Sequence, residues 1–166
     1  MRVLGIDPSS AATGYGLLES RDGEPAVLAY GTIKPSRRSP LQLKLLEIKT
    51  EIERLIAEHR PDEIAVENPF YARNIRTALT LGQVRGAVLV AVAAAGIPLF
   101  EYSPLEIKKA VTGYGQAEKG QVGTMIRALL RVDDDGMEED AADALACALC
   151  HHNTRLFQKK IEDSRP

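Results

Sequence analysis

The stretch Val3-Leu4-Gly5-Ile6-Asp7 places a carboxylate at the end of the first apolar run of the chain. A second apolar run, Ile64-Ala65-Val66-Glu67, ends in the same way. Short apolar runs of this kind are typical of buried strands. In an open α/β sheet, parallel neighbours present their carboxyl ends at one edge, where such sheets bind ligands. If the two strands are parallel neighbours, we therefore expect Asp7 and Glu67 to lie side by side.

The other segments predict an α/β fold. Three early strands with short connections favour an antiparallel meander, and they are expected over residues 2–6, 14–18 and 26–30. A further strand ends at Glu67, and another covers 99–102. Helical spacing and capping signals predict helices over about 39–60, from Ile75 to Ala95, from Ser103, around 122–130, and from about Glu138 past Cys150. Because the later strands alternate with helices, we expect a five-stranded mixed sheet with helices on both faces.

The bulk composition is that of one globular domain. The chain has 166 residues, of which 45% are apolar, and we expect a single domain over 1–152 and a poorly ordered polar tail over 153–166. No uninterrupted apolar run reaches the roughly 20 residues that span a bilayer, and no signal-peptide pattern precedes the first strand. We therefore expect a cytoplasmic protein without membrane contact. The net charge of −2 does not by itself indicate nucleic-acid binding.

Two more carboxylates, Asp140 and Asp143, lead into the apolar stretch of the last predicted helix. Residues three apart share a helix face, with Cβ atoms about 5–6 Å apart, so both can point at the edge that carries Asp7 and Glu67. Four like charges at one place raise one another's pKa values, and a hard cation such as Mg²⁺ or Mn²⁺ removes that penalty. Two such ions, roughly 3.5–4 Å apart, catalyse phosphodiester hydrolysis. The alternative is structural: Asp7 caps a turn, Glu67 pairs with an arginine, and Asp140 caps the helix.

Several motifs occur in order along nearly the whole chain, from residue 2 to about 152. They are Gly5-Ile6-Asp7-Pro8, Thr13-Gly14-Tyr15-Gly16, Val66-Glu67, Leu81-Gly82-Gln83-Val84-Arg85-Gly86, Ala117-Glu118-Lys119 and Asp140-Ala141-Ala142-Asp143-Ala144-Leu145. In order and spacing these motifs resemble those of the RuvC family of Holliday-junction resolvases. One departure is Ser9, which stands where the family usually has glycine and cannot adopt positive φ as freely.

The resemblance implies a ribonuclease H-like fold and a homodimeric endodeoxyribonuclease. Such an enzyme resolves four-way DNA junctions by paired, symmetric nicks during homologous recombination and DNA repair. The implied cofactor is Mg²⁺, with two ions per subunit and Mn²⁺ as a substitute, and cleavage leaves a 5′ phosphate. The RuvA–RuvB branch-migration complex is the implied protein partner. The implied metal ligands are Asp7, Glu67, Asp140 and Asp143, which are the expected catalytic residues together with Lys119.

A loop after Glu67 combines aromatic and basic residues that suit DNA. An aromatic pair beside a metal site can stack on bases or wedge a junction open, although Phe70 can instead close the core under the loop. The resemblance implies a wedge at Phe70, and it implies that Lys119 and Lys108 lie near the scissile phosphate. Lysines at such positions are otherwise solvated surface residues. The expected DNA contacts are Phe70, Tyr71, Arg73, Asn74, Arg76, Lys108 and Lys109.

The segment Cys147-Ala148-Leu149-Cys150-His151 matches the attachment pattern of c-type haem. It lies within the apolar run of the last helix, in a chain without an export signal. We therefore expect no haem and predict two reduced cysteines in the core. His151 and His152 are predicted to be surface or interface side chains near a helix C-terminus, where a cation is favourable.

Other classes of function stay open at the level of the sequence. A sugar-kinase or actin-like ATPase fragment also carries an Asp before a hairpin rich in Gly, Ser and Thr, but that class needs two such domains and 166 residues supply one. A related nuclease that acts on RNA–DNA hybrids, or a catalytically silent DNA-binding module, is the third class. For the dimer, the helix from Ile75 to Ala95 is the predicted interface, because it is apolar on more faces than one core requires.

Overall fold

The computed structural model describes residues 1–68, 75–115, 119–133 and 136–164, and for Lys119 it describes the backbone alone. These residues form a five-stranded sheet with the strand order β3-β2-β1-β4-β5. The strands are β1 (Arg2–Asp7), β2 (Thr13–Arg21), β3 (Glu24–Ile33), β4 (Glu63–Glu67) and β5 (Leu99–Tyr102). The first three form an antiparallel meander, whereas β4 is parallel to both β1 and β5. The predicted mixed sheet is therefore confirmed.

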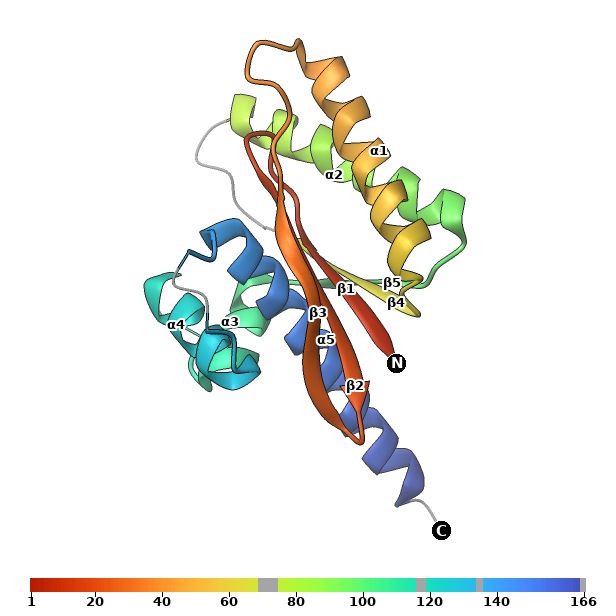
Figure 1. Ribbon diagram of the computed structural model, residues 1–166, viewed down its shortest axis with the longest axis vertical. Helices are drawn as coiled ribbons and strands as arrows, with labels where there is room; N and C mark the ends of the chain where they lie inside the picture. The colour runs from red at the N-terminus through yellow and green to blue at the C-terminus, as the bar shows by residue number, and fades with distance from the viewer. Residues whose placement is uncertain (69–74, 116–118, 134–135, 165–166) are drawn as a thin grey trace.

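Helices cover both faces of the sheet, as predicted (Figure 1). One face carries α1 (Leu41–His59) and α2 (Ile75–Ala95), and the other carries α3 (Pro104–Thr112), α4 (Lys119–Leu130) and α5 (Glu139–Asp163). Successive residues of a strand point to opposite faces. Accordingly, Leu4 and Ile6 of β1 join the core with α1 and α2, whereas Val3 joins the core with α3, α4 and α5.

Local signals in the sequence set where two of the helices begin and end. α1 ends at Arg60, whose left-handed φ of 47° lets its N–H donate to the Ile56 carbonyl oxygen at 2.9 Å. α3 begins at the predicted capping box. There, Ser103 Oγ accepts the Glu106 N–H at 3.3 Å, and the Ser103 N–H donates to Glu106 Oε2 at 2.8 Å. The box fixes the start of α3 directly after β5.

α5 approaches the sheet over glycines in β1 and β2. A Cβ at Gly5 would lie 2.1 Å from the Ala144 carbonyl oxygen, and a Cβ at Gly14 would lie 1.8 Å from that of Asp140. Because atoms cannot approach this closely, the backbone of α5 can occupy its position only if these residues lack a side chain. The glycines therefore set the height of the first turns of α5 above the sheet.

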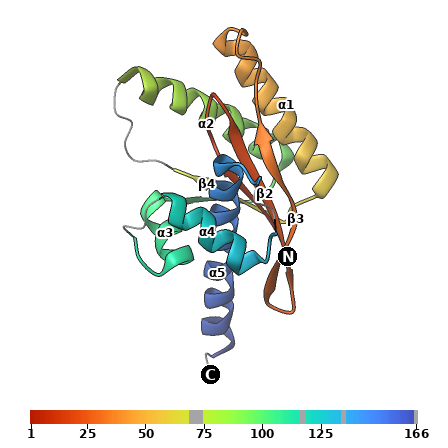
Figure 2. The same cartoon turned by 60° about the vertical axis from the view of Figure 1, so that its left-hand side comes forward.

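α5 differs from its prediction in two respects. It continues as a helix to Asp163 and extends past the sheet, so most of the segment 153–166 is helical instead of forming a poorly ordered tail (Figures 1 and 2). His151 and His152 are fully buried, and the prediction of surface histidines is wrong. Their ring nitrogens meet polar partners on distant strands, namely Glu63 for His151 and Ser20 for His152.

α2 carries more apolar surface than the core uses. Its buried residues are Val84, Val88, Ala91 and Val92, which pack in the core with α1. Among the described residues, α2 is the one helix whose length and composition suffice to cross a membrane, and 22% of its most apolar window is buried. Ile75 and Leu79 are 80% and 65% exposed, so an apolar face of α2 is left uncovered.

Candidate active site

Asp7 and Glu67 lie next to each other at the carboxyl edge of the sheet. β1 and β4 are parallel, and Ile6 is paired with Val66, so the following residue of each strand ends at the same edge. Neighbouring strands are about 4.8 Å apart. Both carboxylate residues are partly exposed. The strand pairing thus brings these two predicted residues together and leaves them accessible.

α5 brings Asp140 and Asp143 to the same edge. Gly14 is paired with Asp7 across β1 and β2, and the Asp140 carbonyl packs directly on Gly14. Asp143 lines a small cavity together with Glu67. Both aspartates are partly exposed at the start of a helix that is buried from Ala144 to His152. The four acidic residues therefore converge from β1, β4 and α5.

The Cys147 side chain is fully buried on α5. Burial raises its pKa well above the ordinary value, and the negative charges of Glu67 and Asp7 raise it further. The thiol therefore stays protonated and acts as a small apolar side chain. Cys150 is also buried and free, so the prediction of two reduced core cysteines is confirmed.

The turn after Asp7 is closed by the buried Thr13. Thr13 Oγ1 accepts the Ser9 N–H at 3.2 Å and donates to the Ser9 carbonyl oxygen at 2.6 Å. Ser9 Oγ also accepts the Ala11 N–H at 3.3 Å. Ser9 does not adopt positive φ, so the turn accommodates serine without backbone strain. The departure at Ser9 therefore leaves the placement of Asp7 intact.

Lys108 is a basic residue that lies beside two of the acidic residues. It lines the cavity of about 230 Å³ that also contains Glu67 and Asp143. The rest of the cavity wall is apolar and consists of Pro104, Ile107 and Val122. Lys109, the next residue of α3, is exposed. Lys108 and the two carboxylates therefore face the same small cavity.

Arg76 lies beside the turn that follows Asp7. It lines a cleft of about 440 Å³ together with Ser9, Ser10 and Thr77, between the turn and the first residues of α2. The remaining predicted contacts cannot be placed in the same way. Lys119 is the first residue of α4 and its side chain lies outside the described residues, as do Phe70, Tyr71, Arg73 and Asn74.

The acidic residues fit a hard divalent cation by donor type, and they gather at one edge of the sheet. All four donors are carboxylates, and oxygen is the ligand that Mg²⁺ prefers. In the described ranges, no three His, Cys, Asp or Glu side chains already form a metal-binding group. The fit therefore rests on the convergence of Asp7, Glu67, Asp140 and Asp143 from three elements, and not on a formed coordination shell.

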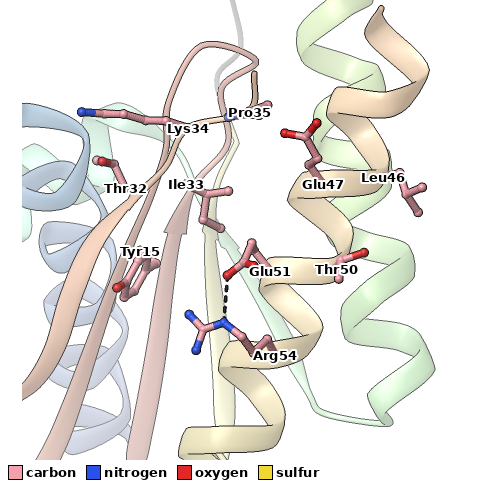
Figure 3. A pocket seen from close by; sticks show the side chains of 10 residues that line it. All are labelled: Tyr15, Thr32, Ile33, Lys34, Pro35, Leu46, Glu47, Thr50, Glu51 and Arg54. Atoms are coloured by element: carbon pink, nitrogen blue, oxygen red, sulfur yellow. Dashed lines mark hydrogen bonds and ion pairs between the residues drawn. The ribbon is translucent and has the colours of Figure 1, made fainter. Parts of the chain in front are cut away.

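An ion pair that the sequence did not predict holds the start of α5. Lys34 follows β3 and pairs with Glu138, whose carboxylate also accepts a hydrogen bond from Thr32 Oγ1 at 3.1 Å. The Lys34 ammonium lowers the pKa of Glu138. A cleft lies next to this ion pair, between α1 and the strands β2 and β3, and Glu51 and Arg54 of α1 pair with each other in it. Figure 3 shows that Lys34 points away from this cleft. Thr32 and Glu138 are 106 residues apart, so no local pattern could have revealed the contact.

The fold and the site together define a class of protein. A five-stranded mixed sheet of this order, with helices on both faces and acidic residues where its parallel strands end, is the arrangement of a ribonuclease H-like domain.

Comparisons with known proteins identify the family within that class. Residues 3–151 match the family model for crossover junction endodeoxyribonuclease RuvC. The protein of that name from Syntrophomonas wolfei is 48% identical over 164 residues, which cover 99% of this chain and 95% of the relative. The one from Halorhodospira halophila is 50% identical over 155 residues, covering 93% and 91%. A solved structure of Thermus thermophilus RuvC in complex with a Holliday junction substrate has 33% identity and a TM-score of 0.86, covering 95% and 96%. The chain therefore belongs to the RuvC family.

Proposed function

We propose that this protein is a divalent-metal-dependent endonuclease that resolves four-way DNA junctions during homologous recombination and repair. Membership of the RuvC family supports the reaction, and the solved relative in complex with a Holliday junction supports the substrate. The observation that carries the proposal is the convergence of Asp7, Glu67, Asp140 and Asp143 at one edge of the sheet. Three elements that are far apart in the sequence contribute to this edge, which is a costly arrangement for a purely structural role.

Asp7, Glu67, Asp140 and Asp143 would hold the metal, which we propose is Mg²⁺, with two ions per subunit and Mn²⁺ as a substitute. When bound, the cations supply Lewis acidity at the scissile phosphate and make water a better nucleophile. The carboxylates of this chain orient that chemistry, because they come from rigid strands and a buried helix. Hydrolysis in this arrangement leaves a 5′ phosphate and a 3′ hydroxyl.

Basic and aromatic residues around the carboxylates would bind the DNA. Lys108 lies in the cavity of Glu67 and Asp143, where its charge can offset negative charge that develops on the phosphate. We assign the same role to Lys119, at the start of α4. Phosphate contacts position a duplex without reading its sequence. The further contacts that we propose are Phe70 as a wedge, with Tyr71, Arg73, Asn74, Arg76 and Lys109.

A homodimer is the proposed working unit, because one site makes one nick and a junction needs two related by two-fold symmetry. Positions 75, 79, 82, 86 and 90 of α2 recur at helical spacing and form one stripe. Ile75, Leu79 and Val90 are 80%, 65% and 58% exposed, and a Cβ at Gly82 or Gly86 would meet nothing within 4 Å. Small residues flanked by exposed apolar ones allow two helices to pack closely. We propose that α2 packs on α2 of a second copy along this stripe.

The family also suggests a cellular setting for this activity. We propose that the protein acts in the cytoplasm, on junctions that the RuvA–RuvB branch-migration complex presents. Membership of the RuvC family supports this proposal.

A substrate comparison tests the proposed function. Wild-type protein and Asp7→Asn are incubated with a mobile four-way junction, a plain duplex and an RNA–DNA hybrid, with Mg²⁺ or with a chelator. We expect Mg²⁺-dependent nicking of the junction by the wild type alone, with junction binding retained by Asp7→Asn. Preferred cleavage of the hybrid would indicate the related nuclease class instead. Nucleotide binding in a calorimeter without junction cleavage would favour the ATPase class.

A further inference from the structure

Four polar side chains are linked in a row that runs from Tyr102, which is paired with Glu67 at the acidic edge, to Glu63 and Arg155 at the opposite end of β4. The Arg155 guanidinium donates to both oxygens of Glu63, with Nη2–Oε1 at 2.6 Å and Nε–Oε2 at 3.0 Å. His151 Nε2 lies 2.7 Å from Glu63 Oε2, and His151 Nδ1 lies 2.7 Å from the Tyr102 hydroxyl. Glu63 is 8% exposed and His151 is fully buried. Each of these hydrogen bonds is short and directional, so the four side chains behave as one hydrogen-bonded unit.

The chemistry of the partners assigns the hydrogens in this unit. Burial lowers the pKa of His151, so the ring is neutral at pH 7 and has one N–H. The Glu63 carboxylate can only accept, so this N–H is on Nε2 and Nδ1 is an acceptor. Burial raises the pKa of Tyr102 to about 12, so its hydroxyl keeps a proton and donates it to Nδ1. All links are therefore satisfied in one protonation state.

This unit joins the elements that carry the acidic residues. Glu63 begins β4, the strand that ends at Glu67. Tyr102 ends β5, is paired with Glu67 in the parallel register, and accepts the Asn68 N–H through its carbonyl oxygen at 2.8 Å. His151 and Arg155 belong to α5, the helix that carries Asp143. The first residue of the short strand β4 is thus bound to α5 directly. Its last residue, Glu67, is paired with Tyr102, whose side chain is bound to His151 of α5.

Directional contacts complement the packing between α5 and the sheet. α5 presents backbone atoms and small residues, Ala141, Ala144 and Ala148, to Gly14 and Gly5, and it seats the Leu145 side chain against Gly16. Small residues fix the height of a helix but oppose sliding along its axis only weakly, so one leucine is the main apolar contact that sets the register over these glycines. A buried charged pair adds little stability compared with apolar packing, and its better attested use is to specify register. The hydrogen-bonded unit therefore adds directional contacts that specify register to a contact made largely by backbone atoms and small side chains.

We propose that the Tyr102–His151–Glu63–Arg155 unit is a positioning element that fixes the register of α5 on the sheet, so that Asp140 and Asp143 meet Asp7 and Glu67 at the distance that a metal requires. The unit touches neither substrate nor metal and acts through α5 and β4. This proposal rests on the proposed function, because its consequence is seen in metal binding and junction cleavage.

The test uses the full-length protein and removes one oxygen atom. Tyr102→Phe keeps the ring and leaves His151 Nδ1 without its donor, and Tyr15→Phe is the matched control on the opposite face of the sheet. Mg²⁺ binding is titrated by calorimetry without DNA, and the single-turnover cleavage rate, the junction Kd and the Tm are measured alongside it. Groups that orient metal ligands are typically worth about 10–100-fold in metal affinity or activity. We expect Tyr102→Phe to weaken Mg²⁺ binding and to slow cleavage by about 10-fold, with the junction Kd unchanged.

A second pair of variants separates positioning from stability. His151→Leu removes both hydrogen bonds, whereas His151→Gln retains an amide that can donate to Glu63. If the unit positions α5, His151→Gln recovers Mg²⁺ affinity and rate relative to His151→Leu, with all assays run below the Tm of each variant. A merely structural role predicts lower Tm values with wild-type Mg²⁺ affinity and rate in every variant, and that result would overturn the proposal. If the wild type itself fails to cleave the junction, the proposed function fails, whereas Mg²⁺ titration still tests the positioning of the carboxylates.

Discussion

Replacing Gly14 by alanine is expected to abolish most of the activity without touching a charged group. The added Cβ would lie 1.8 Å from the Asp140 carbonyl oxygen and 2.4 Å from its carbon, and these are backbone atoms that cannot rotate away. Ordinary contact begins at 3.4 Å, so the first turn of α5 must retreat by about 1.6 Å, the difference between 3.4 and 1.8 Å. A misplacement of about 1 Å in an active site can cost about 100-fold in rate. We therefore expect at least a 100-fold slower cleavage, and overpacking should lower the free energy of unfolding by about 1–3 kcal/mol.

The assay is single-turnover cleavage of a four-way junction in Mg²⁺, with the Tm measured by circular dichroism. Gly123→Ala is the matched control, because its Cβ would meet only the Ala142 Cβ at an ordinary 3.9 Å. This variant should cleave like the wild type. Retained junction binding would show that Gly14→Ala is folded, since the proposed DNA-binding residues lie outside α5. A folded Gly14→Ala that cleaves at the wild-type rate would refute the reasoning that the glycine sets the position of Asp140.

Three further predictions follow from the same structure. Burial lowers the pKa values of His151 and His152 below 6.5. As the pH falls through that value, the unfolded chain therefore binds more protons than the folded chain. The free energy of unfolding should decrease as the pH decreases over this range. Urea unfolding at about pH 7.5 and pH 5.5 checks this, and the double His→Gln variant should show a flatter pH dependence. Leu79→Glu places a charge in the exposed stripe of α2 and should shift the protein to monomers in analytical ultracentrifugation, whereas a persisting dimer would exclude that stripe. Lys108→Gln should reduce the cleavage rate by about 10-fold or more with the metal affinity retained, and an unchanged rate would place the lysine outside the reaction.

The sheet and its acidic edge could be predicted because their signals are local. Asp7 and Glu67 each end an apolar run, and parallel pairing of those runs is enough to bring them together. The approach of α5 was less visible. Gly14 and Gly16 lie in a segment that reads as an ordinary strand, and nothing in that segment shows that a helix backbone lies on it. The height of the helix above the sheet is a tertiary property, and it appears only when both elements are in place.

The histidines show the limit of local reasoning more clearly. His151 and His152 follow an apolar run near the C-terminus, where exposed cations are common. Their partners Glu63 and Ser20 are 88 and 132 residues away, and these hydrogen bonds make burial of the rings acceptable. The length of α5 was underestimated for the same reason. Arg155 stands in the segment that is predicted to be a polar tail, but its ion pair with Glu63 extends the packed part of the helix beyond His152.

The most direct test of the central claim is the map of nicks on a four-way junction with each strand labelled in turn. Wild-type protein with Mg²⁺ should produce two nicks at symmetric positions on opposite strands, each with a 5′ phosphate, and a chelator should abolish both. Asp7→Asn should bind the same junction and leave all four strands intact. Cleavage by Asp7→Asn, or nicking by the wild type that is independent of a divalent metal, would contradict the assignment of Asp7, Glu67, Asp140 and Asp143 as the metal site of a junction resolvase.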